Sequence, residues 1–168
     1  MGTLTPEIAA IIFATKGICN AIKLRKLKGL SAEVKVLGYK TSSGVTLKPN
    51  PEKTTAVLGN YQNDMRFIID ELKVPKSTDY SGNKGGFNVL NVPDELNRTP
   101  EQFFIEYNKP FLDEAIARGD DIVLATKPTN DVLYKRGGSV QTIFGREYEY
   151  LIENGYVFDD ATNMMIKP

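Results

Sequence analysis

The sequence predicts a small α+β or α/β domain, in which three to four helices pack on a small central sheet and a further helix stands at the N-terminus. Two observations lead to this prediction. After residue 50, short apolar runs typical of buried strands alternate with amphipathic stretches of helical spacing, and prolines or glycines separate them. In addition, 168 residues with 41% hydrophobic and 25% charged side chains can bury one core without a disulfide or a metal.

The chain is expected to open with a helix. Thr5 is a good N-cap, Pro6 suits the first helical position, and apolar residues continue at helical spacing as far as Leu30. The last two turns of this helix carry a basic cluster between Lys16 and Lys28.

Two short strands are predicted next, at residues 34–37 and 45–47, on either side of a polar turn over 38–44. The sequence Lys-Pro-Asn-Pro at residues 48–51 is the clearest break in the chain. We therefore expect an N-terminal segment, residues 1–48, and a main domain, residues 49–168.

The main domain is predicted to alternate strands with helices and to end in a hairpin. Thr99 and Gln102 have the spacing of a capping box, Pro110 predicts a bend in the helix that follows, and Gly119 is its expected C-cap. The predicted strands cover residues 54–59, 87–92 and 121–126, the helices 63–72, 99–118 and 145–154, and the hairpin 156–166.

Composition excludes several kinds of site. The chain has no histidine, which removes Ser-His-Asp and Cys-His nucleophile systems and His-ligated zinc. Cys19 is the one cysteine, so neither an internal disulfide nor a four-cysteine zinc site is expected. The longest apolar run, residues 8–14, is far shorter than the roughly twenty residues of a membrane span, so we expect a soluble chain without stable membrane insertion.

The net charge of zero conceals an asymmetry between the two halves. Residues 1–84 contain 13 Lys/Arg and 7 Asp/Glu, whereas residues 85–168 contain 8 and 14. This pattern indicates either that the halves neutralise each other in the fold or that they face partners of opposite charge.

Two loops carry candidate binding groups. Lys84 lies in the sequence Ser-Gly-Asn-Lys-Gly-Gly at residues 81–86, which is either a phosphate cradle or a plain turn before a strand. Thr126 and Lys127 directly follow a buried strand, where α/β sheets commonly bind ligands; the alternative is a loop that simply ends the strand at Pro128.

Glu147-Tyr148-Glu149 is similar to the Glu-x-Glu motif of ADP-ribosyltransferases, and residues 41–43 loosely resemble their Ser-Thr-Ser. The helical pattern, however, predicts that Tyr148, Leu151 and Ile152 pack inward and that both glutamates are exposed. The acidic pairs 113–114, 120–121 and 159–160 would bind a divalent metal only if they converge in space.

Two further places break local rules. Arg146 is a cation near a helix start, which is unfavourable for the helix dipole. Tyr107, Asn108 and Lys109 are expected to be polar groups exposed where the helix bends.

Several runs resemble the C-terminal toxin domains of bacterial polymorphic toxins, which end contact-dependent growth inhibition proteins, filamentous haemagglutinins and Rhs proteins. The resemblance covers roughly residues 50–168 and rests on residues 85–93, 107–113, 116–121, 144–148 and 155–156. It implies an interbacterial toxin, secreted as the end of a larger surface protein, that acts in the cytoplasm of the target cell. It also implies a cognate immunity protein as partner, and residues 1–48 would be associated with passage into the target.

Many such toxins are nucleases, so our leading hypothesis is a metal-independent ribonuclease that acts on tRNA, without a cofactor and with or without an activating protein of the target cell. Cleaving RNA needs a base, an acid and cations on the phosphate. Without histidine, the base would be a carboxylate, Glu147 or Glu149, or a lysine of lowered pKa. The candidate catalytic residues are Lys84, Lys109, Thr126, Lys127, Arg146 and Glu147.

Three other classes remain open. An NAD-consuming toxin, either an ADP-ribosyltransferase or a glycohydrolase, is favoured by near-neutral charge and by Glu147 and Glu149. A metal-dependent DNase requires the acidic pairs to converge. A non-enzymatic interaction domain would lack a pocket among Lys84, Thr126 and Arg146.

Overall fold

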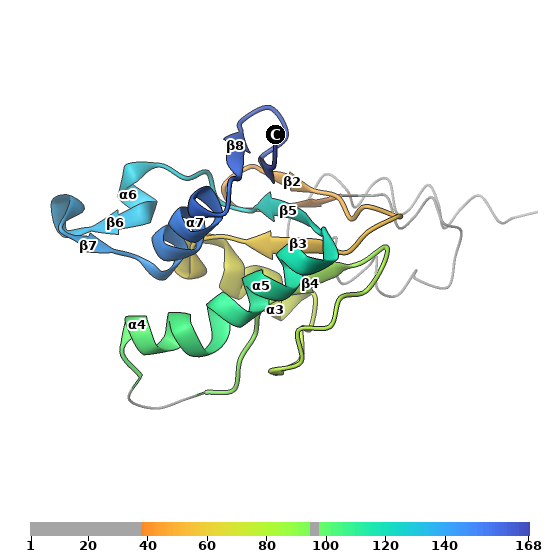
Figure 1. The fold of residues 1–168 in the computed structure, drawn as a ribbon, viewed down its shortest axis with the longest axis horizontal. Coiled ribbons are helices and arrows are strands. Elements are labelled where there is room, and N and C mark those ends of the chain that lie inside the picture. The colour runs from red at the N-terminus through yellow and green to blue at the C-terminus, as the bar shows by residue number, and fades with distance from the viewer. Residues whose placement is uncertain (1–37, 95–97) are drawn as a thin grey trace, which may run out of the picture.

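The centre of the fold is a five-stranded mixed sheet (Figure 1). The computed structural model describes residues 38–94 and 98–168, so the predicted N-terminal helix, its basic cluster and the strand at 34–37 lie outside the described residues. β4, β3 and β5 are parallel, and β9 and β8 form an antiparallel hairpin along β5. In sheet order the strands are β4 (Phe87–Val89), β3 (Thr55–Leu58), β5 (Asp121–Leu124), β9 (Met164–Ile166) and β8 (Val157–Asp159).

Helices connect the strands in the order that the sequence predicts, with one additional short helix after β5 that was not predicted. After β3 come the π-helical turn η2 (Tyr61–Met65) and α3 (Arg66–Glu71). Between β4 and β5 run α4 (Pro100–Phe103), the π-helical turn η3 (Phe104–Asn108) and α5 (Lys109–Arg118). After β5 come α6 (Asn130–Leu133) and α7 (Ile143–Glu153).

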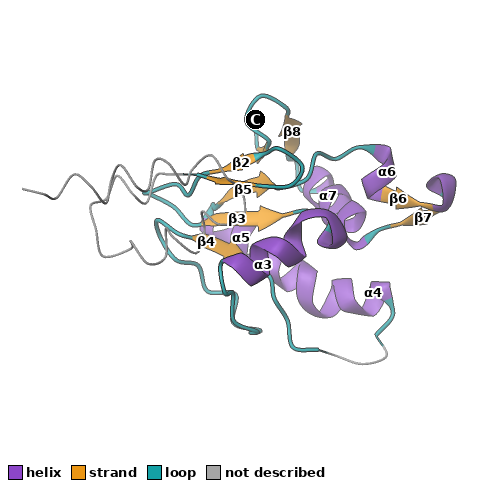
Figure 2. Ribbon diagram, turned by 180° about the vertical axis from the view of Figure 1, so that it is seen from behind, coloured by secondary structure: helices purple, strands orange, loops and turns teal. Residues whose placement is uncertain are grey.

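The sheet is covered on both faces, which makes three layers. Successive strand residues point to opposite faces: Leu58 and Leu124 pack against α5, α6 and α7, whereas Val57 and Val123 pack against η2 and α3. Figure 1 shows α5 and α7 in front of the sheet, and Figure 2, from behind, shows α3 in front of it. The predicted class, a small central sheet packed by helices, is confirmed.

Two small hairpins complete the described chain. β1 (Tyr39–Lys40) pairs with β2 (Thr46–Leu47), so the polar turn predicted from residue 38 in fact begins with a strand. Tyr39, Val45 and Leu47 are buried in the core layer on the α3 side. The second hairpin projects beyond the end of the sheet; it consists of β6 (Tyr134–Lys135), the 3₁₀ turn η4 (Arg136–Gly138) and β7 (Val140–Gln141) (Figure 1).

The long helical stretch before β5 follows the sequence signals closely. The capping box between Thr99 and Gln102 forms with both of its hydrogen bonds, and Gly119 ends α5 in the left-handed conformation. The irregularity predicted at Pro110 takes the form of the π-helical turn η3 just before it, because proline lacks an amide hydrogen and its ring clashes with a carbonyl of the preceding turn. This turn matters for the site described below.

Candidate functional site

A cleft of about 730 Å³ opens at the carboxyl ends of β3 and β4. Its floor is the end of β3, and its walls come from η2 and α3, from the loop after β4, from α4 and η3, and from the first turns of α7. Most of the lining is apolar, and Tyr61, 60% exposed, is one of the residues that line it. In sheets with parallel strands, ligands bind in such crevices outside the carboxyl ends.

The polar groups that are buried in this cleft are Asn108 of η3 and Glu147 of α7. Asn108 is 3% exposed and Glu147 is 5% exposed. The amide nitrogen Nδ2 of Asn108 donates a hydrogen bond of 2.7 Å to Oε1 of Glu147. Within the described residues, Glu147 has no ion-pair partner, and the amide oxygen Oδ1 of Asn108 accepts no hydrogen bond.

Burial controls the protonation of Glu147. It raises the pKa of this carboxyl to about 7, while the hydrogen bond from Asn108 lowers the pKa in part. At neutral pH the ionised and neutral forms of the side chain are therefore both populated. A carboxyl with a pKa in this range can take up a proton in one step and release it in another, which is what acid–base catalysis requires.

The rotation of α7 places Glu147 in the cleft. Thr142 caps the helix by accepting a hydrogen bond from the amide of Gly145, so α7 begins at Ile143, two residues before the predicted start. Phe144, Glu147 and Leu151 then form one buried stripe at spacings of three and four residues. The prediction that Glu147 is exposed was wrong, and so was the prediction that Ile152 packs inward, because Ile152 is 42% exposed.

A close helix contact explains this rotation. A Cβ atom at Gly145 would lie 2.2 Å from the carbonyl oxygen of Leu133 at the end of α6, so the glycine side of α7 is pressed against α6. The apolar pattern of α7 does not reveal this contact. The expectation that Tyr107 and Asn108 are exposed at the helix bend was also wrong, because η3 turns both side chains inward.

The structure separates the six predicted site residues, all of which lie in the described part of the chain. Glu147 alone among them lines the cleft. Lys127 and Lys109 lie on the surface in ion pairs of 2.8 Å with Asp160 and Asp113 respectively.

Lys84 precedes β4 at the amino ends of the parallel strands and pairs with Glu52 at 3.3 Å. It is therefore at the opposite end of the sheet from the cleft. Arg146, next to Glu147 on α7, turns away from the cleft, and its Nε atom is buried without a hydrogen-bond partner among the described residues.

Thr126 belongs to a separate polar cluster that the sequence analysis did not identify. Its hydroxyl donates to Asp64 at 2.6 Å and accepts from the amide of Asn60 at 3.0 Å. Asp64 is 1% exposed and also accepts from the amide and the hydroxyl of Ser43 in the β1–β2 turn. These bonds tie the β1–β2 hairpin to the carboxyl ends of β3 and β5, so Thr126 and Ser43 have a structural role here.

The remaining motifs do not come together. Glu149 accepts a hydrogen bond from Gln141 at 2.6 Å on the exposed side of α7, away from Glu147.

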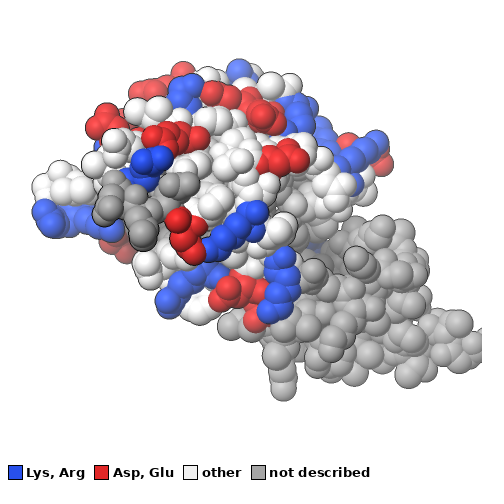
Figure 3. Space-filling view, turned by 90° about the horizontal axis from the view of Figure 1, so that it is seen from below, with Lys and Arg blue, Asp and Glu red and all other residues white. Residues whose placement is uncertain are grey.

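Within residues 38–94 and 98–168, no group of three or more Asp, Glu, Cys or His side chains is arranged to hold a metal ion. On the face drawn in Figure 3, the coloured cations and anions are interspersed rather than gathered in one basic band.

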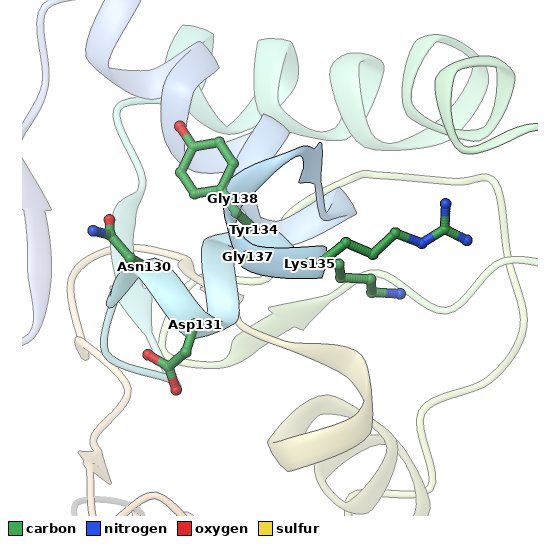
Figure 4. A pocket seen from close by; sticks show the side chains of 7 residues that line it. Asn130, Asp131, Tyr134, Lys135, Gly137 and Gly138 are labelled. Atoms are coloured by element: carbon green, nitrogen blue, oxygen red, sulfur yellow. The ribbon is translucent and has the colours of Figure 1, made fainter.

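A second, more open hollow of about 740 Å³ lies under the β6–β7 hairpin. In Figure 4, Lys135 points away from Asn130 and Asp131, so the side chains that line this hollow do not converge. Lys135 and Arg136 have no ion-pair partner within the described part of the chain. The hollow is an exposed surface of mixed charge rather than a formed site.

None of the helices that the structure describes has the length and apolar character needed to cross a membrane.

Buried polar side chains meet in the cleft that contains Asn108 and Glu147, so this cleft is the candidate site on which a functional assignment can be based. In comparisons with known proteins, no family model matches this chain, and no curated protein and no solved structure is significantly similar to it.

Proposed function

We propose that this chain is an interbacterial toxin domain that consumes nicotinamide dinucleotide in the target cell, with the cleft as its active site and Glu147 as its catalytic carboxylate. The toxin part of the proposal rests on the sequence resemblance over residues 50–168. The reaction rests on one observation: Glu147 is a buried carboxyl without an ion-pair partner among the described residues, in a mainly apolar cleft.

The charge of the cleft favours a cationic ligand over a polyanion. Burying a carboxylate without a cation is unfavourable, and a positively charged ligand group would remove that penalty. The oxidised nicotinamide ring is planar, largely apolar and positively charged, so it suits this lining. A phosphate beside Glu147 would instead be repelled. Of the predicted cations, Lys84, Lys109, Lys127 and Arg146, none lines the cleft, and Arg98, which does line it, is held in an ion pair of 2.9 Å with Glu106.

The reaction follows from this arrangement. The bond between C1′ of the ribose and the ring nitrogen breaks, and its electron pair leaves with neutral nicotinamide. The ionised Glu147 stabilises the positive charge that develops on the ribosyl group, as carboxylates do in glycoside hydrolysis. Water then adds to C1′ and transfers a proton to Glu147, which releases it to solvent. A protein side chain in place of water would give ADP-ribosyl transfer.

A tRNA ribonuclease is the second candidate. It is favoured by Lys135 and Arg136 on the projecting β6–β7 hairpin, which have no ion-pair partner in the described residues and offer phosphate contacts. Glu147 would then serve as the base that takes the proton from a 2′-hydroxyl.

Induced expression in a bacterium without an immunity gene tests the proposal. We expect growth arrest and collapse of the nicotinamide dinucleotide pool within minutes, while total RNA and genomic DNA stay intact. Glu147→Gln should lower the rate at least about 100-fold, because it removes the ionisable oxygen. Glu149→Gln on the same helix is the matched control and should retain activity.

Two results would overturn the proposal. Discrete tRNA fragments with an intact dinucleotide pool would favour the ribonuclease, and unimpaired growth would remove the toxin assignment itself. If the toxin assignment holds, we also expect a cognate immunity protein, delivery as the end of a larger secreted protein, action in the target cytoplasm and no resident cofactor. A target-cell activating protein would show as activity in lysate that the purified chain lacks.

A further inference from the structure

The wall of the cleft contains two side-chain oxygens that receive no hydrogen bond from the described residues, and one of them, Oδ1 of Asn108, is fully buried. Asn108 uses its amide nitrogen to bind Oε1 of Glu147, and its amide oxygen Oδ1 is buried without a partner. The second oxygen of Glu147, Oε2, also has no hydrogen bond from the described residues. Both side chains line the cleft. A buried acceptor without a donor is unfavourable, and a donor on a bound ligand would remove this cost.

We infer that Asn108 is a specificity-determining residue, whose Oδ1 acts with the free oxygen of Glu147 to bind a vicinal diol of the substrate. This inference rests on the proposed function and adds to it which part of the substrate reaches the wall. Two acceptors need two donors. The ribose next to the scissile bond carries adjacent 2′ and 3′ hydroxyls, whereas an ionised phosphate has no proton to donate.

The geometry also assigns a positioning role to Asn108. The π-helical turn η3 turns this residue into the cleft, and its hydrogen bond holds one oxygen of Glu147. The other oxygen makes no hydrogen bond to a described residue and is left to bind the ligand. A diol seated on both acceptors places C1′ of the same ribose ring beside the carboxylate, which is where the positive charge develops.

Binding measurements on the full chain in the Glu147→Gln background test this inference without consuming the substrate. The probes are nicotinamide dinucleotide and its analogue that lacks both hydroxyls of the nicotinamide ribose. In this background an amide nitrogen replaces the free oxygen of Glu147, so the comparison reports the hydrogen bond to Oδ1 of Asn108, and we expect the analogue to bind roughly 10-fold more weakly. When Asn108→Leu is added, the ratio of the two dissociation constants should fall to about 2 or less, because leucine is similar in size to asparagine but has no acceptor.

Activity of the single variant Asn108→Leu gives a second readout that a purely structural role would not change. The midpoint of its pH–rate profile should move upward, because the hydrogen bond that lowers the pKa of Glu147 is gone. Asn108→Ser, which keeps an acceptor, should recover part of the preference for the diol. Thermal melting of each variant establishes that it is folded.

The outcomes separate this inference from the proposed function. Equal binding of the two probes by folded Glu147→Gln would overturn the diol inference while leaving the nicotinamide assignment intact. Retained preference for the diol in folded Asn108→Leu would overturn the role of Asn108. Failure to bind either probe, together with an intact dinucleotide pool in cells, would overturn both.

Discussion

At the scale of single residues, Glu147 is where folding and chemistry conflict. The helix places a carboxyl on its buried stripe between Phe144 and Leu151, where an apolar side chain would stabilise the fold more. Asn108 compensates only part of this penalty with one hydrogen bond. Such a residue is a functional candidate on physical grounds, because active sites are where strongly shifted pKa values concentrate.

The burial of the Glu147 carboxyl predicts how the stability of the fold depends on pH. The pKa of Glu147 is raised in the folded state from 4.5 to about 7, so the folded chain binds more protons than the unfolded chain between these values. The free energy of unfolding should therefore fall as pH rises from 4.5 to about 7, by about 3 kcal/mol, and level off above. Urea denaturation of Glu147→Gln at a series of pH values should lack this decline, so that this variant is more stable than the wild type at pH 8. Glu149→Gln should behave as the wild type does, and a Glu147→Gln chain that is less stable at pH 8 would contradict the assignment.

The same titration predicts the pH dependence of activity. Because the reaction uses the ionised form of Glu147, the rate should rise with pH and reach half of its plateau near pH 7. Initial rates of nicotinamide release between pH 5 and 9 provide the measurement. A rate that falls over this range would mean that the neutral form is the active one.

The sequence alone could predict which residues were chemically interesting but not where they lie. The Glu-x-Glu pattern selects Glu147, and the bend at Pro110 draws attention to Asn108, yet both were expected on the surface. Their burial depends on the close approach of Gly145 to α6 and on the inward turn of η3, and the direction of each side chain is set by packing against neighbouring elements.

At the scale of elements, α7 shows how one glycine sets a helix orientation. Gly145 allows the helix to approach the end of α6 so closely that no Cβ fits between them. The same rotation that creates this contact points Glu147 into the cleft. The contact is thus needed both for packing and for the site.

Gly145→Ala should separate α6 from α7 and displace Glu147. We expect a loss of about 1–3 kcal/mol in unfolding free energy, typical of overpacking, and a marked loss of activity. Thermal denaturation and initial rates measure the two effects. Ile152→Ala, on the exposed end of the same helix, should change stability by no more than about 0.5 kcal/mol. Superimposable melting curves for Gly145→Ala and the wild type would show that the contact is unimportant.

Elements with local signals were predicted well. The capping box at Thr99, the left-handed glycine at Gly119 and the hairpin at the end of the chain each depend on residues close together in sequence, and the structure confirms them. The two π-helical turns were not predicted. Their form depends on how the surrounding helices pack, although Pro110 indicated the position of one of them.

At the scale of the whole molecule, the Asp64 cluster joins segments that are far apart in sequence. Ser43, Asp64 and Thr126 come from the β1–β2 turn, η2 and the end of β5. No pattern in a single sequence reveals such a convergence. For the same reason, the predicted set of cations did not assemble: each residue suited phosphate binding, but their strands and helices carry them to different ends of the fold.

Thr126→Val should weaken this connection without touching the cleft. The substitution keeps the shape but leaves the amide of Asn60 and an oxygen of Asp64 short of a partner, so we expect a loss of about 1–3 kcal/mol in urea denaturation. Thr78→Val, at an exposed threonine in a loop on the surface, is the control and should have little effect. Equal unfolding midpoints for the two variants would mean that the cluster does not stabilise the fold.

The position of Tyr61 offers an optical readout of the cleft. This tyrosine lines the cleft and is 60% exposed, and the 168-residue sequence contains no tryptophan. A Tyr61→Trp substitution would therefore create a single indole fluorophore beside the proposed binding site, in an otherwise dark background at its excitation wavelength. In the Glu147→Gln background, where the ligand is not consumed, quenching of its emission on titration with nicotinamide dinucleotide would report occupancy directly and in real time.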